Sequence, residues 1–204
     1  LSDDHTIWHR RTSIERYAAE RGVAVVMPAA GKSWYTDTGD KYLTFIGEEL
    51  PRVCRSFFRG MSDKAEDTFV VGLSMGGYGA LKIGMRERDS FCAAAGLSSV
   101  ADIERFMKID RFVDVAAPIF GDGGVIPSSE NLFSLASELV GKENQPRLYM
   151  GVGKDDFLYS DNQKLREHIE SLGLDLTYRE GEGIHSWIFW DEHIRYVLEW
   201  AFKK

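Results

Sequence analysis

The sequence predicts an α/β fold with a mainly parallel sheet and helices on both of its faces. Short apolar runs at 68–73, 91–97 and 147–153 alternate with stretches whose apolar residues recur at helical spacing. Such alternation requires crossover connections, which make neighbouring strands parallel. The length of 204 residues fits one domain with a sizeable core, so we expect a single domain over 1–204.

The first part of the chain is expected to contain two helices and one strand. Residues 1–8 show no period and predict a loop, and residues 12–15 (TSIE) have the pattern of a capping box that starts a helix. The apolar run 23–28 is typical of a strand buried on both faces. A second helix is expected over 46–57, with Pro51 either at a kink or in its first turn.

Later segments keep this rhythm except at 100–145. That stretch contains only short helical pieces around a glycine-rich run, so we expect a small cap-like excursion over the sheet edge and not a second domain. Beyond it, 160–173 is expected to be a helix that opens with a capping box. The alternating run 174–178 predicts a strand, and 194–201 has the apolar spacing of a last helix.

Composition argues against several classes of function. The net charge is −7 with no basic run, which argues against a nucleic-acid partner, and no apolar stretch is long enough to span a membrane. Cys54 and Cys92 lack the spacing of metal ligands. We expect two free thiols, in preference to a disulfide, and therefore a reducing, cytoplasmic location. The first residue is not methionine, so a removed signal peptide stays an open alternative.

The central motif is Gly72-x-Ser74-x-Gly76, placed between a predicted strand and a predicted helix. A sharp strand-to-helix turn strains the backbone at Ser74 and exposes its hydroxyl above the sheet. Glycine is expected at both flanking positions because a Cβ there would collide with the neighbouring strand and helix. The N–H groups of the new helix face any negative charge that forms beside Ser74. This favours a nucleophile that attacks a carbonyl over a tight turn with a buried serine.

A serine nucleophile needs a base, and the base needs an orienting anion. His185 lies in a glycine-flanked loop after a strand and is the preferred base, whereas His5 and His9 have no further metal ligand nearby and predict no metal site. Asp155 and Asp156 follow the preceding strand at the same edge of the sheet. The order Ser, Asp, His along the chain is the one that the α/β-hydrolase topology requires.

An oxyanion needs two hydrogen-bond donors. The N–H of Met75 is expected to be the first, and the segment around Leu1 and Ser2 is expected to supply the second. Three aromatic residues flank the expected mouth and either shape the substrate pocket or pack in the core; they are Trp34, Tyr35 and Trp187. Apolar residues of the excursion either wall an acyl pocket or belong to the core; they are Ile109, Phe112, Ile119, Phe120 and Phe133.

Three segments resemble the tributyrin-esterase branch of the esterase D family, which includes S-formylglutathione hydrolases, acetyl esterases and feruloyl-type esterases. They are 72–81 (GLSMGGYGAL), 156–159 (DFLY) and 185–190 (HSWIFW). The resemblance covers nearly the whole chain. It implies an α/β-hydrolase fold with Ser74 as nucleophile and His185 as base. It also implies Asp156 as the acid, with Asp155 as the fallback, and neither a metal nor another cofactor.

The family implies hydrolysis of a small-molecule, short-chain ester through an acyl-enzyme. The alternatives are an S-formylglutathione hydrolase, a sugar-ester (acetyl or feruloyl) esterase, and a non-catalytic hydrolase-fold binding protein. Tyr78 favours the esterase over the thioester branch, whose pattern has histidine there. A homo-oligomer is an open alternative to a monomer.

Family members also carry earlier strands and a His-Gly pair before the position of Leu1. By this match the N-terminal strands are expected to be missing from the chain, and Leu1 would give the second oxyanion N–H. We then expect one sheet edge to be unpaired, and this fragment not to fold well alone.

Overall fold

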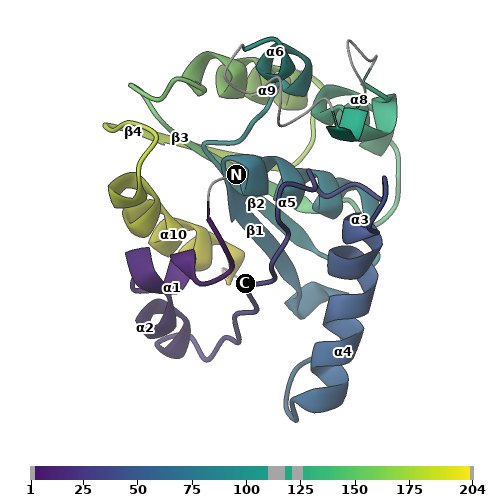
Figure 1. Ribbon diagram of the computed structural model, residues 1–204, viewed down its shortest axis with the longest axis vertical. Helices are drawn as coiled ribbons and strands as arrows, with labels where there is room; N and C mark the ends of the chain where they lie inside the picture. The colour runs from purple at the N-terminus through teal and green to yellow at the C-terminus, as the bar shows by residue number, and fades with distance from the viewer. Residues whose placement is uncertain (1–2, 110–117, 121–125, 203–204) are drawn as a thin grey trace.

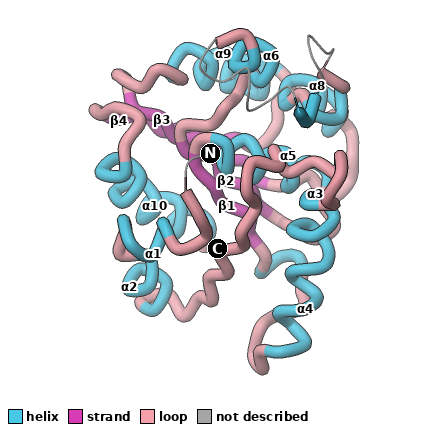
Figure 2. The backbone as a smooth tube through the Cα atoms, viewed as in Figure 1, coloured by secondary structure: helices cyan, strands magenta, loops and turns pink. Residues whose placement is uncertain are grey.

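The parallel sheet is the centre of the computed structural model, which describes residues 3–109, 118–120 and 126–202 (Figures 1 and 2). Its strands are β1 (Phe69–Leu73), β2 (Ala93–Leu97), β3 (Arg147–Gly153) and β4 (Leu176–Gly181). Within the described residues they form one sheet in the order β1-β2-β3-β4, with every neighbouring pair parallel. The predicted parallel sheet is confirmed.

The described helices cover both faces of this sheet. They are α1 (Ile7–Arg11), α2 (Ile14–Ala19), α3 (Tyr42–Thr44), α4 (Leu50–Phe57), α5 (Met75–Arg86), α6 (Ile103–Met107), α8 (Leu132–Leu139), α9 (Tyr159–Ser171) and α10 (Trp187–Ala201). A π-helical turn spans Phe45–Glu49, and 3-10 turns span Ala65–Asp67 and Ser128–Glu130. Figure 1 shows α1, α2 and α10 grouped on one side of the molecule, away from α6, α8 and α9.

Two hydrophobic cores lie on opposite faces of the sheet. Ala94 and Leu148 pack with residues of α5, α8 and α9, whereas Ala95 and Tyr149 pack with residues of α2 and α10. This division follows from the two-residue period of a strand, which sends successive side chains to opposite faces. The predicted helices on both faces are therefore present.

The small residues of β2 let α5 approach the sheet closely. A Cβ on Gly84 would lie 2.3 Å from Cβ of Ala94, and a Cβ on Gly77 would lie 2.6 Å from Oγ of Ser99. Neither site has room for a side chain, so a glycine-lined face of α5 rests on β2. This contact fixes where α5 begins, and with it the position of Ser74.

Residues 23–28 do not form the predicted strand. None of the described strands lies beside them, and Val25 and Val26 are 40% and 42% exposed. A continuous apolar run indicates a doubly buried strand only where partner strands lie on both sides. Here the segment crosses the surface after α2.

Helix α1 begins within the stretch 1–8 that was predicted as a loop and continues to Arg11. Only five residues are helical, which is too short to show a period in the sequence. The Asp4 carboxylate accepts the N–H of Thr6 at 2.8 Å just before the helix begins. A local carboxylate therefore organises a helix that the apolar pattern could not reveal.

The first predicted capping box is partly formed, since the Thr12 hydroxyl accepts the N–H of Ile14 at 3.2 Å, whereas the second, at 160–163, is absent. Ser13 makes no side-chain cap bond at the start of α2, and its own N–H donates to Asp191 Oδ1 at 2.9 Å. Helix α9 begins at Tyr159 and is preceded by Leu158, whose N–H donates to Asp156 Oδ1 at 2.9 Å. At both helices a carboxylate outside the expected box binds the backbone N–H.

The helix expected over 46–57 belongs to a longer helical segment, 42–57. It runs through α3, the π-helical turn and α4. Pro51 lies in the first turn of α4, just after the π-helical turn Phe45–Glu49, so its missing N–H falls where the hydrogen-bond pattern of the helical segment changes. Of the two predicted alternatives for this proline, the first-turn position is observed.

The described part of 100–145 covers the same sheet face as α5. Asp102 caps α6 by accepting the N–H of Arg105, and Asn131 caps α8 by accepting those of Phe133 and Ser134. Apolar residues of both helices join the core formed by α5 and α9. These helices are therefore placed over the part of the sheet that carries Ser74.

Candidate active site

Ser74 occupies a strained turn between β1 and α5. Its φ of 55° lies in the left-handed region, which is costly for a residue with a Cβ. Backbone hydrogen bonds stabilise this strained conformation. The N–H of Ser74 donates to Leu97 O at 2.8 Å, and the carbonyl of Ser74 accepts the N–H of Tyr78 at 3.1 Å and that of Val100 at 3.2 Å. The turn is thus anchored to β2 and to the loop that follows it.

The two glycines of the motif are not equally constrained. A Cβ on Gly72 would lie 2.0 Å from the carbonyl oxygen of Gly76, inside the turn itself. A Cβ on Gly76 would meet only the Tyr35 hydroxyl, at 3.3 Å. The predicted collision is therefore confirmed at Gly72, whose Cβ would strike the start of helix α5, and is wrong at Gly76, where a Cβ would meet neither a strand nor a helix.

Backbone hydrogen bonds join the loop after β3 to the loop after β4. The N–H of Lys154 donates to Gly181 O at 2.9 Å, and that of Asp155 donates to Gly183 O at 3.0 Å. A Cβ on Gly153 would lie 2.2 Å from Gly183 O, and Gly183 itself has a φ of 140°. Glycine at 153 and 183 therefore lets the loop after β3 approach the loop after β4.

This approach places three predicted side chains in one hydrogen-bonded chain. His185 Nε2 lies 3.0 Å from Ser74 Oγ. On the other side of the ring, His185 Nδ1 lies 2.9 Å from Asp156 Oδ2 and 3.1 Å from its Oδ1. Asp155 is exposed, and its side chain makes no such contact among the described residues. The carboxylate beside His185 is that of Asp156.

Asp156 is 4% exposed and remains ionised. Burial alone would raise its pKa, but hydrogen bonds from His185 and from the N–H of Leu158 outweigh burial and hold the pKa below its usual range. An ionised Asp156 accepts a hydrogen bond from His185 Nδ1–H, which leaves the Nε2 lone pair facing Ser74. Phe157 and Trp190 pack against the imidazole, each with its ring centroid at 4.8 Å.

Ser98 and Trp190 support this chain and were not among the predicted site residues. Ser98 is fully buried with a φ of 45° and hydrogen-bonds the Asp156 carboxylate, while its Oγ accepts the Trp190 indole N–H at 3.0 Å. A signal for Ser98 exists, because it follows β2 at the sheet edge where Ser74, Asp156 and His185 follow theirs. For Trp190 the signal is its place in the segment 185–190, one of the three that carry the family resemblance.

The predicted oxyanion donors are only partly within the described residues. Met75 begins α5, so its N–H is among those that lack a helical acceptor. Leu1 and Ser2 lie outside the described residues.

The predicted pocket residues differ in their surroundings. Trp34 is fully buried against the rings of Tyr78, Phe106 and Phe120, so it packs in the core and does not line a mouth. Tyr35 is partly buried against α5. Trp187 lies between two indoles, with centroids 5.5 Å from Trp8 and 5.1 Å from Trp190. Four excursion residues are partly buried against the core, and Phe112 lies outside the described residues; the four are Ile109, Ile119, Phe120 and Phe133.

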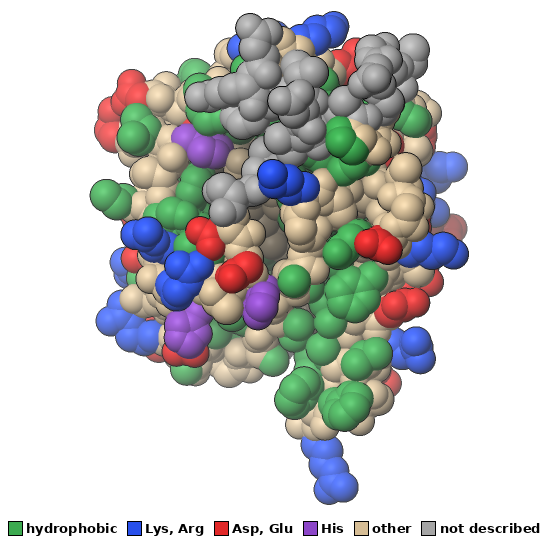
Figure 3. All heavy atoms as spheres, in the orientation of Figure 1, with side chains coloured by type: hydrophobic (Ala, Val, Ile, Leu, Met, Phe, Trp, Pro, Cys, Tyr) green, Lys and Arg blue, Asp and Glu red, His purple; other side chains and the backbone are tan. Residues whose placement is uncertain are grey.

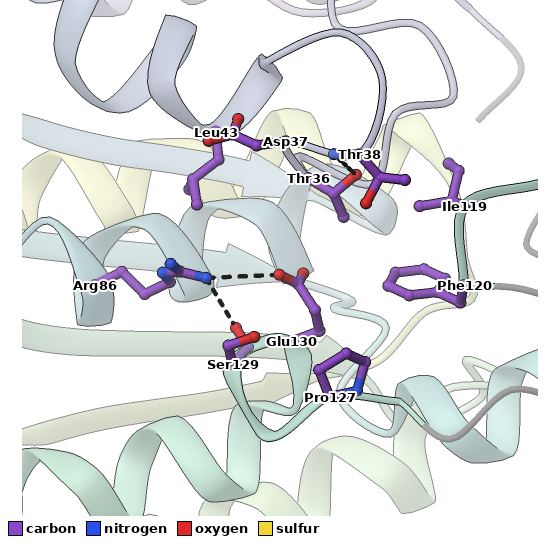
Figure 4. Close-up of a pocket in the computed structure, with 10 residues that line it drawn as sticks. All are labelled: Thr36, Asp37, Thr38, Leu43, Arg86, Ile119, Phe120, Pro127, Ser129 and Glu130. Carbon is purple, nitrogen blue, oxygen red and sulfur yellow. Dashed lines mark hydrogen bonds and ion pairs between the residues drawn. The ribbon is translucent and has the colours of Figure 1, made fainter.

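A cavity of about 380 Å³ opens towards the other end of α5 (Figure 4). Its lining residues are Thr36, Asp37, Thr38, Leu43, Arg86, Ile119, Phe120, Pro127, Ser129 and Glu130. Arg86 follows Ser74 by twelve residues, which is about 18 Å along a helix at 1.5 Å per residue. Its lining residues do not include Ser74, Asp156 or His185.

No group of three or more His, Cys, Asp or Glu in the described chain is placed to hold a metal ion. Cys54 and Cys92 are free thiols. Of the described helices, none combines the length and hydropathy needed to cross a membrane.

A strained serine at a strand-to-helix turn, followed along a parallel sheet by an aspartate loop and a histidine loop, defines a serine hydrolase of the α/β-hydrolase fold. Residues 3–199 match the family model Esterase, described as "Putative esterase". The chain belongs to this esterase family and is a carboxylic ester hydrolase.

Three similar proteins support this assignment. An acetyl esterase from Caldicellulosiruptor saccharolyticus is 33% identical over 96% of this chain and 78% of its own length. Substrate-bound FphF, a fluorophosphonate-binding serine hydrolase of Staphylococcus aureus, superposes with a TM-score of 0.92 at 32% identity, over 100% of this chain and 81% of its own. The S-formylglutathione hydrolase FrmB of the same organism gives 0.87 at 30% identity, with the same coverage. The predicted resemblance to the esterase D family is confirmed.

Proposed function

We propose that this chain hydrolyses short-chain acyl esters through an acyl-enzyme formed on Ser74. The observation that carries the proposal is the continuous chain from Ser74 Oγ to His185 Nε2 at 3.0 Å and from His185 Nδ1 to Asp156 at 2.9 Å. A base within 3.2 Å of the hydroxyl, itself oriented by a buried anion, is the arrangement that activates serine. In this proposal Asp156 orients and stabilises the protonated imidazole.

The first half of the reaction acylates the serine. Ser74 Oγ attacks the ester carbonyl carbon while His185 Nε2 accepts the hydroxyl proton, and the carbonyl oxygen becomes an oxyanion. The N–H of Met75 stabilises that charge, with the second donor assigned to Leu1. The bond from the carbonyl carbon to the alcohol oxygen then breaks, and His185 gives its proton to the leaving alkoxide.

The second half regenerates the enzyme with the same groups. Water attacks the acyl carbon while His185 accepts one water proton, and a second oxyanion forms at the same donors. The bond to Ser74 Oγ breaks, His185 returns the proton to that oxygen, and the carboxylic acid leaves. No cofactor takes part in these steps.

A small-molecule ester is the proposed partner. The similarity to a protein named acetyl esterase supports a short acyl group, in preference to a long one, for the substrate of this chain. A cytoplasmic location and self-association into a homo-oligomer stay predictions, the first in keeping with two free thiols.

A second candidate is the hydrolysis of S-formylglutathione, a thioester that the same three side chains could cleave. It is favoured by the 30% identity to the Staphylococcus aureus enzyme over the whole of this chain. Sugar esters carrying acetyl or feruloyl groups are a further alternative from the sequence resemblance. Comparing kcat/KM for S-formylglutathione, an acetylated sugar and p-nitrophenyl acetate separates the three, because each proposal requires its own substrate to give the highest value.

The test of the mechanism is hydrolysis of p-nitrophenyl acetate by the wild type and by Ser74→Ala. We expect kcat to fall by at least about ten-thousandfold, because removing the nucleophile leaves only oxyanion and binding effects. Circular dichroism and thermal melting of both proteins check that folding is unchanged. A wild type without turnover, or a Ser74→Ala protein that keeps its activity, contradicts the proposal.

A further inference from the structure

Lys82 is a buried cation that the proposed mechanism does not use. Its side chain is 0% exposed and forms an ion pair with Glu130, whose side chain is 12% exposed. Glu130 closes the 3-10 turn Ser128–Glu130 and therefore belongs to the excursion. The Tyr78 hydroxyl donates to the Glu130 carbonyl at 2.8 Å and contacts its Oε2 at 3.2 Å. Two residues of α5 thus bind the excursion at Glu130.

Glu130 is also held from the cavity side. Arg86 Nη1 lies 3.5 Å from Glu130 Oε1 and donates to Ser129 O at 3.3 Å, as Figure 4 shows. One carboxylate oxygen therefore faces Lys82 and the other faces Arg86. The carboxylate has little freedom to move, so it is a fixed anchor for the Lys82 ammonium.

Lys82 also reaches a strained loop. Its Nζ donates to the carbonyl of Trp34 at 3.2 Å. Trp34 and Tyr35 have φ values of 50° and 54°, and consecutive left-handed residues other than glycine persist only where their surroundings hold them. Lys82 supplies one of the contacts that hold this loop on α5.

The loop places Tyr35 against the start of α5. A Cβ on Gly79 would lie 2.2 Å from the Tyr35 ring, so the ring fills the groove that this glycine leaves. The Tyr35 hydroxyl lies beside Gly76, in the helical turn that Ser74 begins. Burial raises the pKa of Tyr35 to about 12, which keeps the hydroxyl protonated at the pH of the reaction.

We infer that Lys82 and Glu130 are positioning residues that determine specificity: their buried ion pair holds Tyr35 against the first turn of α5 and so fixes the wall of the substrate site beside Ser74. The inference rests on the proposed function. Tyr78 and Lys82 are four residues apart on α5, which places both side chains on the side of the helix that binds Glu130. With the wall fixed, the site favours short esters, and releasing it admits longer acyl groups.

The test compares acyl-chain selectivity in Lys82→Met and Glu130→Gln with that of the wild type. We expect KM for p-nitrophenyl acetate to rise about fivefold with kcat changed less than about twofold, because the triad is intact. The ratio of kcat/KM for the hexanoate to that for the acetate should rise by about fivefold or more. Lys64→Met, which removes an exposed pair with Glu66, is the matched control and should change neither quantity.

A double-mutant cycle separates positioning from general destabilisation. If Lys82 acts through the Tyr35 wall, Lys82→Met should change KM and the acyl ratio in the wild type but not in a Tyr35→Ala background. Independent, additive effects overturn the inference, as does a lower melting temperature with an unchanged acyl ratio. If Lys82→Met does not fold, the same cycle is measured with Glu130→Gln, because glutamine has nearly the same side-chain volume as glutamate.

Labelling with short- and long-chain alkyl fluorophosphonates gives a readout that needs no turnover. We expect the long-to-short ratio of labelling rates at Ser74 to rise in both variants. If the wild type is active and the variants keep its ratios, the inference fails while the proposed function stands. If the wild type is labelled but hydrolyses no ester, the labelling ratio still decides the inference. A wild type that is neither labelled nor active overturns both.

Discussion

At the residue scale, Ser98 connects the elements that carry the proposed triad. Its backbone N–H donates to Gly151 O of β3 at 2.6 Å, and its side chain bridges the Trp190 indole and the Asp156 carboxylate. Trp190 in turn lies edge-on to the His185 ring. Ser98 therefore contacts no reacting atom but restrains the two groups that orient the base.

Ser98→Ala is expected to lower kcat by about tenfold with little change in KM. Tenfold corresponds to roughly 1.4 kcal/mol, which is close to the worth of one hydrogen bond to a charged group. Ser98 also helps to lower the pKa of Asp156, so its loss moves that pKa upward.

The measurement is kcat and kcat/KM for p-nitrophenyl acetate from about pH 4 to pH 9, the range in which His and carboxyl groups titrate. Ser99→Ala is the matched control, since the Ser99 hydroxyl is buried and has no hydrogen-bond partner in the described part of the chain. Equal losses of kcat in the two variants would show that Ser98 has no special role.

At the element scale, the sequence pattern predicted elements whose stabilising contacts are local or periodic. β3 has the bounds 147–153 that the apolar run indicates, and β1, β2 and α5 differ from expectation only at their ends. The strand expected at 23–28 fails because burial on two faces depends on neighbouring chains, which a single segment cannot show. The capping box at 160–163 fails because α9 already begins at Tyr159, where the Asp156 carboxylate accepts the N–H of Leu158.

The residues of the candidate site that follow strands could be predicted from the sequence. The residue that lies inside a helix could not. Ser74, Asp156 and His185 all follow strands at one edge, so topology alone groups them. In the sequence, nothing distinguishes Lys82 from the other polar residues of a helix. Its partner Glu130 lies 48 residues further along the chain, so the sequence does not indicate the pair. Only packing reveals that this lysine is buried.

The strand-to-helix turn gives a prediction that distinguishes its two glycines. Gly72→Ala places a Cβ 2.0 Å from a backbone oxygen of the same turn, so the turn must open; we expect loss of about 3 kcal/mol or more of stability and of nearly all activity. Gly76→Ala meets only the Tyr35 hydroxyl at 3.3 Å and should cost less than about 1 kcal/mol. Urea unfolding and p-nitrophenyl acetate hydrolysis measure both variants, and equal tolerance at the two positions would refute the steric account.

At the scale of the whole molecule, one surface of the described chain is unusually apolar. Phe57 and Phe58, at the end of α4, are 78% and 61% exposed, and Val53 is 42% exposed. Figure 3 shows hydrophobic side chains gathered over this part of the molecule. Arg55 of α4 donates to the Thr68 hydroxyl at 2.8 Å, so the patch lies near β1, the strand at one edge of the described sheet. Exposed apolar side chains beside a strand edge favour association.

We therefore expect the chain to self-associate through the end of α4. Phe57→Glu combined with Phe58→Glu should raise the dissociation constant at least about tenfold, because burying one phenylalanine contributes about 1.5–3 kcal/mol and each new carboxylate repels its copy in a chain of net charge −7. Light scattering coupled to size-exclusion chromatography over a concentration series measures the change. Val140→Glu, at a residue 51% exposed beyond the end of α8, is the control and should leave association unchanged. A wild type that runs as a 23.1 kDa monomer at every concentration would show that this patch does not pair with a second copy.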